Sequence, residues 1–300
     1  MNLKTLVLKV VHRIIGKKNV VSNKRKFKEE IFTKLPSNYI DLLSFSYDRK
    51  LSKADAKLGR KIETFRVIVA DRYKDKSVST FASPKSGSEL FDSEGNVIPG
   101  RFVESKKGSF ARTGTGIPTG IQLKKITEAI SARSILELGT NTGLSGCYFL
   151  SSLQQPYLCT IEGSSDLCKI AEMNLGQITK NFEVVNGMFD DVIEDLIQSG
   201  RKFDLAFVDG QHEEQATLHY AEKLKSLVNP GGGILFDDIY WSEGMHSAWL
   251  KVSKDPAFST TLDLGSRGLC ILATKDDKAE KIHFELTKYT GKPLLTRSGW

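Results

Sequence analysis

One short segment, residues 134–146, constrains the fold of this chain more than any other part of it. Ile135 and Leu138 belong to a short apolar stretch that is typical of a buried strand. Gly139 and Gly143 follow, and glycine permits both a tight turn and the close approach of a ligand to the backbone. A helix that begins just after this turn would present free N–H groups to the polar end of a ligand. The segment therefore predicts a strand, a turn and a helix that bind a nucleoside cofactor.

Strand and helix patterns alternate from about residue 115 onward. Strands are expected at 134–139, 157–162, 182–186, 203–209 and 232–238. Helices are expected between them, at about 143–153, 165–178, 190–199 and 213–228. Such alternation predicts an α/β fold with a doubly wound, mostly parallel sheet, whose ligands lie at the carboxyl ends of the strands. Two further β-like stretches flank Gly265-Ser-Arg-Gly268, which predicts a terminal antiparallel hairpin.

The net charge of +7 is concentrated at the front of the 300 residues. Residues 1–60 hold fifteen Lys and Arg against five Asp and Glu, a balance of +10, so the remaining residues sum to −3. This distribution argues against a basic field over the whole surface, and nucleic acid is not expected as a partner. The four cysteines form no CxxC pair, which indicates core residues in a reducing, cytoplasmic compartment.

The front of the chain predicts a basic, mainly helical region over residues 1–112, ahead of a second domain at 113–300. Apolar residues recur at helical spacing within residues 1–20, but the stretch is too short and too charged to span a bilayer. We expect it to dock on its own protein or on a partner subunit, as in a homodimer; contact with an anionic membrane surface and disorder are the alternatives.

The rest of the front divides into three parts. Residues 17–30 are lysine-rich and indicate a linker or a solvated helix end, and residues 38–73 carry a helical apolar stripe. Residues 74–112 predict a long irregular connection.

The glycine turn, read from Glu137-Leu-Gly-Thr-Asn-Thr to Gly143, resembles the first motif of class I S-adenosylmethionine-dependent methyltransferases. The resemblance covers about residues 115–273, and the terminal hairpin is similar to the sixth and seventh strands of that family, which implies a seven-stranded sheet. A nicotinamide-binding fold is the rival, but its GxGxxG spacing differs from that of Gly139, Gly143 and Gly146.

The resemblance implies S-adenosylmethionine (SAM) as the cofactor. Glu162 ends the second strand, where an acid can accept hydrogen bonds from both ribose hydroxyls, although a solvated strand-end carboxylate is the alternative. Met188 or Phe189 could cover the adenine ring, or belong to the core. The expected cofactor-binding residues are Glu137, Gly139, Thr140, Asn141, Gly143, Ser145, Glu162, Gly163, Gly187, Met188, Phe189 and Asp209.

The fourth strand ends in Val208-Asp-Gly-Gln-His212, which is similar to the branch of the family that methylates hydroxyl groups, as in catechol and caffeoyl-CoA O-methyltransferases. That resemblance implies a catalytic Asp209. Those relatives carry a lysine base where this chain has His212, and an imidazole can do the same work because its pKa lies near neutral pH. The alternative for His212 is a structural cap of the next helix.

The same branch binds a divalent cation, and the resemblance implies Asp209, Asp237 and Asp238 as its ligands. Three oxygen ligands suit Mg²⁺, Mn²⁺ or Ca²⁺. The alternative is that Asp237 or Asp238 orients substrate or backbone without a metal. Tyr240 and Trp241 follow and are expected to line the acceptor pocket; packing on the next helix is the alternative. The glycine-rich stretch at residues 113–120 is expected to form a lid over the cofactor.

The sequence thus predicts a bacterial-type enzyme that transfers a methyl group from SAM to a hydroxyl of a small molecule, such as a sugar or a natural product. Two alternatives stay open. One is a catalytically silent module that binds the cofactor as a scaffold, and the other is an RNA-modifying methyltransferase guided by the basic front.

Overall fold

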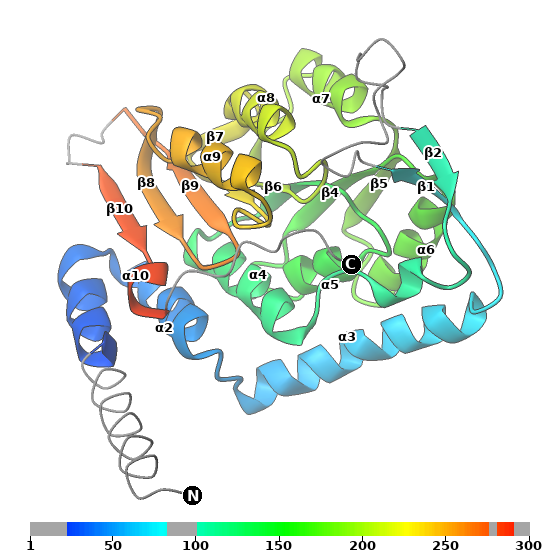
Figure 1. Ribbon diagram of the computed structural model, residues 1–300, viewed down its shortest axis with the longest axis horizontal. Helices are drawn as coiled ribbons and strands as arrows, with labels where there is room; N and C mark the ends of the chain where they lie inside the picture. Colours follow the sequence, from blue (N-terminus) through cyan, green and yellow to red (C-terminus); the bar gives the residue numbers. More distant parts are fainter. Residues whose placement is uncertain (1–22, 83–100, 276–280, 291–300) are drawn as a thin grey trace, which may run out of the picture.

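The computed structural model describes residues 23–82, 101–275 and 281–290, and they build one large sheet flanked by helices (Figure 1). The sheet strands are β3 (Ser134–Leu138), β4 (Tyr157–Glu162), β5 (Phe182–Asn186), β6 (Phe203–Val208), β7 (Val228–Phe236), β8 (Phe258–Asp263), β9 (Gly268–Leu272) and β10 (Ile282–Glu285). Their order across the sheet is β10-β8-β9-β7-β6-β3-β4-β5.

The central strands β5, β4, β3, β6 and β7 are parallel, as predicted. They are rich in Val, Ile, Leu and Phe because helices cover both faces of the sheet. The predicted terminal hairpin is confirmed: β8 and β9 pair antiparallel, and β9 also runs antiparallel to β7.

The expectation of seven strands is wrong, because β10 adds an eighth. This strand pairs parallel with β8 and thereby covers what would otherwise be an exposed edge. Phe284 is buried, and the Thr261 hydroxyl lies 2.8 Å from Nδ1 of His283. A strand of four residues that pairs with no sequence neighbour carries too little periodicity to be predicted.

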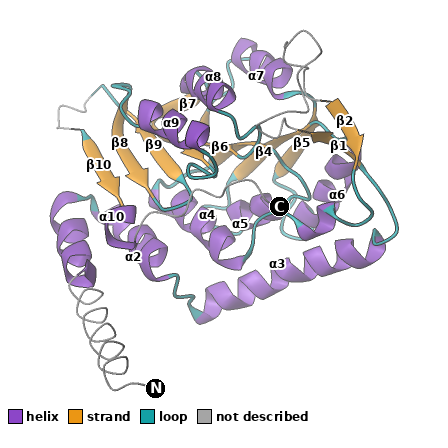
Figure 2. Ribbon diagram, in the orientation of Figure 1, coloured by secondary structure: helices purple, strands orange, loops and turns teal. Residues whose placement is uncertain are grey.

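The helices form two layers (Figure 2). One face is covered by α4 (Ile117–Ala129), α5 (Leu144–Leu150) and α6 (Ser165–Leu175), and the other by α7 (Phe189–Gln198), α8 (Glu214–Lys225) and α9 (Glu243–Val252). Each layer has its own hydrophobic cluster: Phe207 and Tyr148 belong to the first, and Phe236 and Trp249 to the second.

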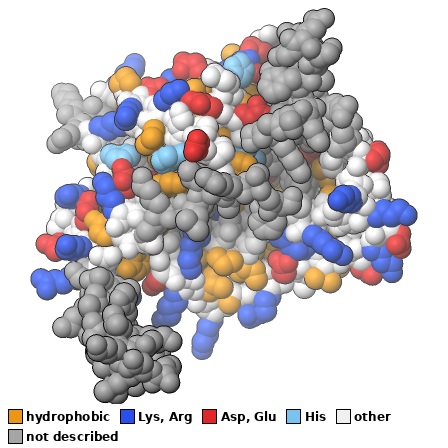
Figure 3. Space-filling view, in the orientation of Figure 1, with side chains coloured by type: hydrophobic (Ala, Val, Ile, Leu, Met, Phe, Trp, Pro, Cys, Tyr) orange, Lys and Arg blue, Asp and Glu red, His pale blue; other side chains and the backbone are white. Residues whose placement is uncertain are grey.

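The N-terminal region packs on the first layer. The predicted helical stretch is confirmed as η1 (Ser37–Tyr39), α2 (Ile40–Asp48) and α3 (Lys53–Arg72). Both α2 and α3 contact α4, and their residues share one hydrophobic cluster with the sheet. Lys and Arg side chains line the lower edge of the molecule, where α3 lies (Figure 3).

Residues 23–30 are not a linker; they begin a helix, and five of them are exposed, as expected of a solvated helix end, but this helix also packs on the protein. Residues 23–34 are helical, and Phe27 is 2% exposed. Its ring stacks on Tyr47 with centroids 4.4 Å apart and meets the edge of Tyr289. The sparse apolar positions among many lysines concealed this packing. The helix predicted within residues 1–20 lies outside the described residues.

Residues 74–112 are not wholly irregular, because β1 (Ser79–Ala82) pairs antiparallel with β2 (Arg101–Glu104). The segment also holds η2 (Phe110–Arg112). The chain ends in the short helix α10 (Thr287–Thr290) within the described part. In the ranges that the structure describes, no helix is both long and apolar enough to cross a membrane.

We predict that Phe27→Ala lowers the free energy of unfolding by about 3–5 kcal/mol, because it empties a buried aromatic cluster. Urea unfolding measures this change. The matched control is Phe32→Ala on the same helix, where the side chain is 64% exposed and the expected change is within about 0.5 kcal/mol. Equal effects of the two variants would contradict the docking of this helix.

Candidate active site

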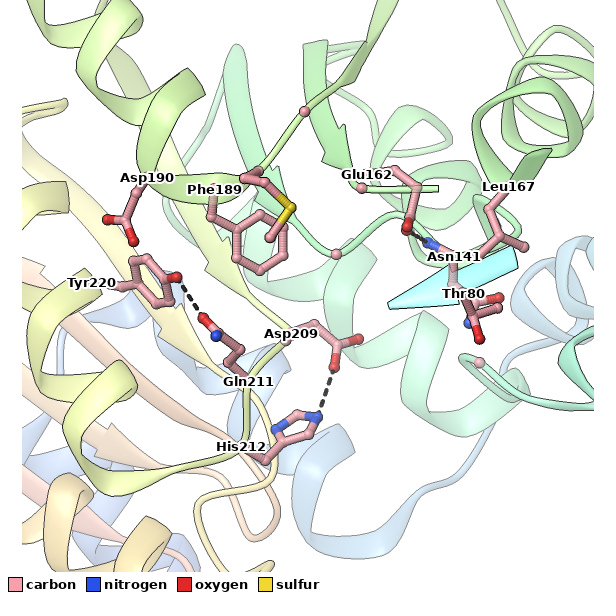
Figure 4. Close-up of a pocket in the computed structure, with 16 residues that line it drawn as sticks. Thr80, Asn141, Glu162, Leu167, Phe189, Asp190, Asp209, Gln211, His212 and Tyr220 are labelled. Atoms are coloured by element: carbon pink, nitrogen blue, oxygen red, sulfur yellow. Dashed lines mark hydrogen bonds and ion pairs between the residues drawn. The ribbon is translucent and has the colours of Figure 1, made fainter. Parts of the chain in front are cut away.

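The carboxyl ends of the parallel strands surround a cavity of about 370 Å³. In Figure 4, Glu162 and Asn141 lie on one side of it, Phe189 and Tyr220 on the other, and Asp209 between them. Backbone hydrogen bonds align the strand ends: Gly139 N donates to Ile161 O at 3.1 Å and Asp209 N to Leu138 O at 3.0 Å. The cavity therefore opens where the fold class predicts a ligand.

The glycine turn leaves β3 in a conformation that its sequence permits. Gly139 has φ +100°, and a Cβ at this position would collide with the carbonyl oxygen of Asp209. The missing side chain thus makes room for the neighbouring strand end as much as for a ligand. Asn141 also has a positive φ, of 49°, which asparagine tolerates better than most residues.

Glu162 is fixed by the backbone on two sides. Its Oε2 accepts a hydrogen bond from Asn141 N at 2.8 Å, and its Oε1 accepts one from Ser164 N at 2.9 Å. Burial raises the pKa of Glu162 above its ordinary value, and these backbone donors oppose the rise. Ser164 also caps α6, since its hydroxyl accepts from Leu167 N at 3.3 Å. The carboxylate is thereby held at the cavity wall.

The turn after β5 forms the opposite wall. Asn186 Nδ2 donates to Glu162 O at 2.8 Å and to Gly163 O at 3.1 Å, which fixes the turn against β4. Met188 then stays 38% exposed at the cavity, and Phe189 packs on Gly210. This wall is apolar and aromatic, and such a surface suits the packing of a flat ligand ring against it.

A cluster of acids and one imidazole occupies the far end. Nε2 of His212 lies 3.7 Å from Asp209 Oδ1 and 3.9 Å from Asp238 Oδ2. Desolvation raises the pKa of Asp209 well above its ordinary range, and repulsion from Asp237 adds to this shift. Burial also raises the pKa of Asp238. His212 does not cap α8, whose N-cap is Glu213 without a side-chain cap bond.

Arg267 is a residue of this region that the sequence analysis missed. It sits in the β8–β9 turn with 1% exposure, and its Nη2 lies 2.9 Å from Asp237 Oδ2. The sequence contains one available signal, a charged residue inside a hairpin turn, but nothing in it indicates which strand end that turn meets.

The comparisons with known proteins agree with this geometry. Residues 136–239 match a family model described as a methyltransferase domain.

These residues form a methyltransferase domain.

Caffeoyl-CoA O-methyltransferase 2 of Zea mays is 31% identical to this chain over 137 residues, which are 43% of the chain and 50% of the relative. The chain thus spans about half the length of that curated relative. The O-methyltransferase of Bacillus cereus, solved in complex with SAH, is 22% identical with a TM-score of 0.47 and covers 53% of this chain and 82% of its own. TomG of Streptomyces achromogenes, solved with SAM, is 19% identical with a TM-score of 0.47 and covers 54% of this chain and 82% of its own.

The methyltransferase domain brings most of the predicted residues together. The cavity is lined by Gly139, Asn141, Glu162, Gly163, Gly187, Met188, Phe189, Asp209 and His212. Gly143 is the N-cap of α5 and does not line the cavity, and a Cβ at this position would press on Ala171. Ser145 and Thr140 are buried behind the turn, where Thr140 Oγ1 lies 2.6 Å from Thr160 Oγ1.

Of the two residues predicted to line the acceptor pocket, Trp241 lies beside His212 and Tyr240 is buried. Tyr240 is 6% exposed, and its hydroxyl donates to Asp263 Oδ2 at 2.7 Å, so it does not offer a free polar group to the cavity. Trp241 lies beside His212 with ring centroids 6.1 Å apart.

The methyltransferase domain draws part of its site from the N-terminal region. Thr80 of β1 lines the cavity, and the Ser164 hydroxyl donates to Ser79 O. Gly114, within the stretch predicted as a lid, also lines it. Arg66 of α3 holds that stretch through Thr115 O, at 2.7 Å. Neither Thr80 nor Arg66 lies in a sequence motif that would have indicated its place in the site.

Glu137 lies behind the turn, fully buried, and accepts a hydrogen bond from the Thr160 hydroxyl at 2.7 Å. Burial raises the pKa of Glu137 to about 7, against the donated hydrogen bonds of Ser145 and Thr160. The folded protein therefore keeps a proton that the unfolded chain releases above about pH 4.5. The contribution of Glu137 to stability is greatest at low pH and falls as the pH rises to about 7.

We predict that Glu137→Gln, which is neutral at every pH, does not show this loss. The difference in unfolding free energy between variant and wild type should shift in favour of the variant by up to about 3 kcal/mol from pH 5 to pH 8. Urea unfolding at both pH values measures it, with exposed Glu172→Gln as the control. A difference that does not change with pH would contradict the buried, protonated state.

Proposed function

We propose that this protein transfers the methyl group of SAM to a hydroxyl of a small molecule. One observation carries the proposal: a single cavity holds the backbone-anchored Glu162 at one side and the Asp209–His212 pair at the other. Membership of residues 136–239 in a methyltransferase-domain family supports it.

The residues around the cavity fit SAM. The Glu162 carboxylate keeps lone pairs free of its two backbone bonds, and these can accept the ribose hydroxyls. Met188 and Phe189 offer an apolar surface to the adenine. The volume of about 370 Å³ lies in the range of small-molecule sites. When bound, SAM supplies an electrophilic methyl group on a positively charged sulfur.

His212 acts as the general base in this proposal. Its imidazole accepts the proton of the acceptor hydroxyl as the oxygen attacks, and the two carboxylates within 4 Å stabilise the imidazolium that forms. Asp209 and Asp238 therefore orient the imidazole of His212 and offset the positive charge that it gains with the proton. Much of the remaining rate gain comes from holding the two reactants in line.

The acceptor, in this proposal, is a sugar or natural-product hydroxyl. It would enter beside Trp241, whose ring borders His212. Tyr240 makes no polar contact with the acceptor in this proposal. Its ring stacks on the His246 ring, with centroids 4.7 Å apart. The similarity to the Zea mays caffeoyl-CoA O-methyltransferase supports a hydroxyl as the methylated group.

The predicted divalent cation does not fit the residues as they stand. Oδ2 of Asp237 pairs with the cationic guanidinium of Arg267, which would repel a metal ion on the same carboxylate, and Oδ1 accepts from Asp238 N at 2.9 Å. Within the described ranges, no group of three His, Cys, Asp or Glu side chains could hold a metal ion. The proposed reaction therefore does not use Mg²⁺, Mn²⁺ or Ca²⁺.

We further propose that residues 113–300 are the catalytic unit and that the region 1–112 completes its site, as Thr80 and Arg66 indicate. Contact of residues 1–20 with a membrane or a subunit, a homodimer and a cytoplasmic location stay predictions from the sequence.

Isothermal titration with SAM and SAH tests the cofactor assignment. We predict that Glu162→Gln weakens binding by about 10- to 150-fold, because one ribose hydroxyl loses a charged acceptor worth about 1.5–3 kcal/mol. Glu172→Gln, at an exposed position of α6, is the matched control and should bind like the wild type. No binding of SAM by the wild type, or wild-type affinity in Glu162→Gln, would contradict the assignment of SAM to this cavity.

Turnover tests the base. We predict that His212→Asn lowers kcat by about 10²–10⁴-fold and leaves SAM affinity within twofold. Formation of SAH with caffeoyl-CoA, free catechols and monohydroxy phenols measures the rate. His283→Gln, on the far edge of the sheet, is the control. Affinity for SAM without turnover on any acceptor would favour the scaffold alternative.

A further inference from the structure

Arg267 carries a full charge into the protein interior, close to the proposed base. Its side chain is 2% exposed, and burying an unpaired guanidinium would cost several kcal/mol. Three acceptors and one ring compensate the two Nη groups, whereas the buried Nε has no hydrogen-bond partner among the described residues. Nη2 pairs with Asp237 at 2.9 Å, Nη1 donates to Gln122 Oε1 at 3.1 Å and to Thr119 O at 3.4 Å, and the guanidinium lies 5.9 Å from the Phe207 ring centroid.

The position of Arg267 is fixed from separate parts of the chain. Its carbonyl accepts from Leu264 N at 2.8 Å, and the adjacent Ser266 O accepts from Ile239 N at 3.0 Å, which ties the turn to the exit of β7. Gln122 is itself held, since its Nε2 donates to Ser46 Oγ at 2.8 Å. A chain of contacts thus runs from α2 through α4 to the end of β7.

This charge lies where the three predicted ligands would need a cation. Asp209, Asp237 and Asp238 leave adjacent strand ends, and their carboxylates repel one another. Arg267 offsets this repulsion, because its positive charge acts on both Asp209 and Asp238. A divalent ion on Asp237 would share that carboxylate with the guanidinium, and two cations there repel.

We propose that Arg267 takes the place of the divalent cation at the strand ends, so that this protein binds no metal there. The proposal deepens the proposed function and rests on it. Arg267 is a positioning residue: it holds Asp237, whose Oδ1 accepts the backbone N–H of Asp238, and Asp238 in turn faces His212. The acceptor is then bound without chelation, so it needs one hydroxyl and no second oxygen beside it.

The first test measures Mn²⁺ by electron paramagnetic resonance on the full chain with SAH. The expected result is no stoichiometric Mn²⁺ site. We also expect 10 mM EDTA to change the SAH affinity by less than about twofold, because a chelator cannot shift binding through a metal that the protein does not hold. A stoichiometric site that Asp237→Asn abolishes would overturn the proposal. Failure of SAH to bind would instead count against the proposed function and leave the Mn²⁺ result readable.

The second test removes the guanidinium. Arg267→Met leaves the three carboxylates without their cation, so we expect it to bind Mn²⁺ at least about tenfold more tightly than the wild type and to gain thermal stability on adding it. The matched control is the double variant Asp237→Asn/Arg267→Met, which lacks both charges and should not respond. A wild type that responds equally, or a single variant that does not respond, would overturn the proposal. If Arg267→Met does not fold, the first test decides alone.

Discussion

The alignment of the parallel strand ends is the constraint on which the rest of the structure depends. Each strand exit donates its first backbone N–H to a neighbouring strand: Gly139 to Ile161, Asp209 to Leu138 and Asp237 to Val208. Residues more than 20 positions apart in sequence therefore converge on one edge. The turn at Gly139, the carboxylate of Glu162 and the acids beside His212 inherit their positions from this alignment.

Electrostatics then divides the edge into two parts. On one side, backbone N–H groups hold the single carboxylate of Glu162, and an apolar wall faces it. On the other side, three aspartates gather around His212 and the buried Arg267. The first arrangement suits a nucleoside, and the second suits proton removal beside a sulfonium. One cavity with both properties is what a methyl transfer to oxygen requires.

The sequence predicted those features whose signal is local. The strands β3 to β7, the helices between them and the β8–β9 hairpin each have apolar periodicity or a glycine turn, and all were found where expected, with β7 starting earlier. Glu162 and Asp209 could be named because they end such strands. The roles of the predicted site residues remain predictions, since position alone does not show chemistry.

Features built from contacts between distant segments were not predictable. Phe27 is buried only because Tyr47 and Tyr289 meet it, and β10 is a strand only because β8 offers an edge. Thr80 reaches the cavity through the pairing of β1 with β2, and Arg267 meets Asp237 because the hairpin turn folds over the end of β7. The spacing of residues along the chain does not indicate these contacts between distant segments.

A crystal structure with SAH bound tests the central claim most directly. The account predicts that the ribose hydroxyls contact Glu162, that the adenine lies against Met188 and Phe189, and that the sulfur faces the space before His212. SAH bound elsewhere, or in this cavity with its ribose away from Glu162, would contradict it.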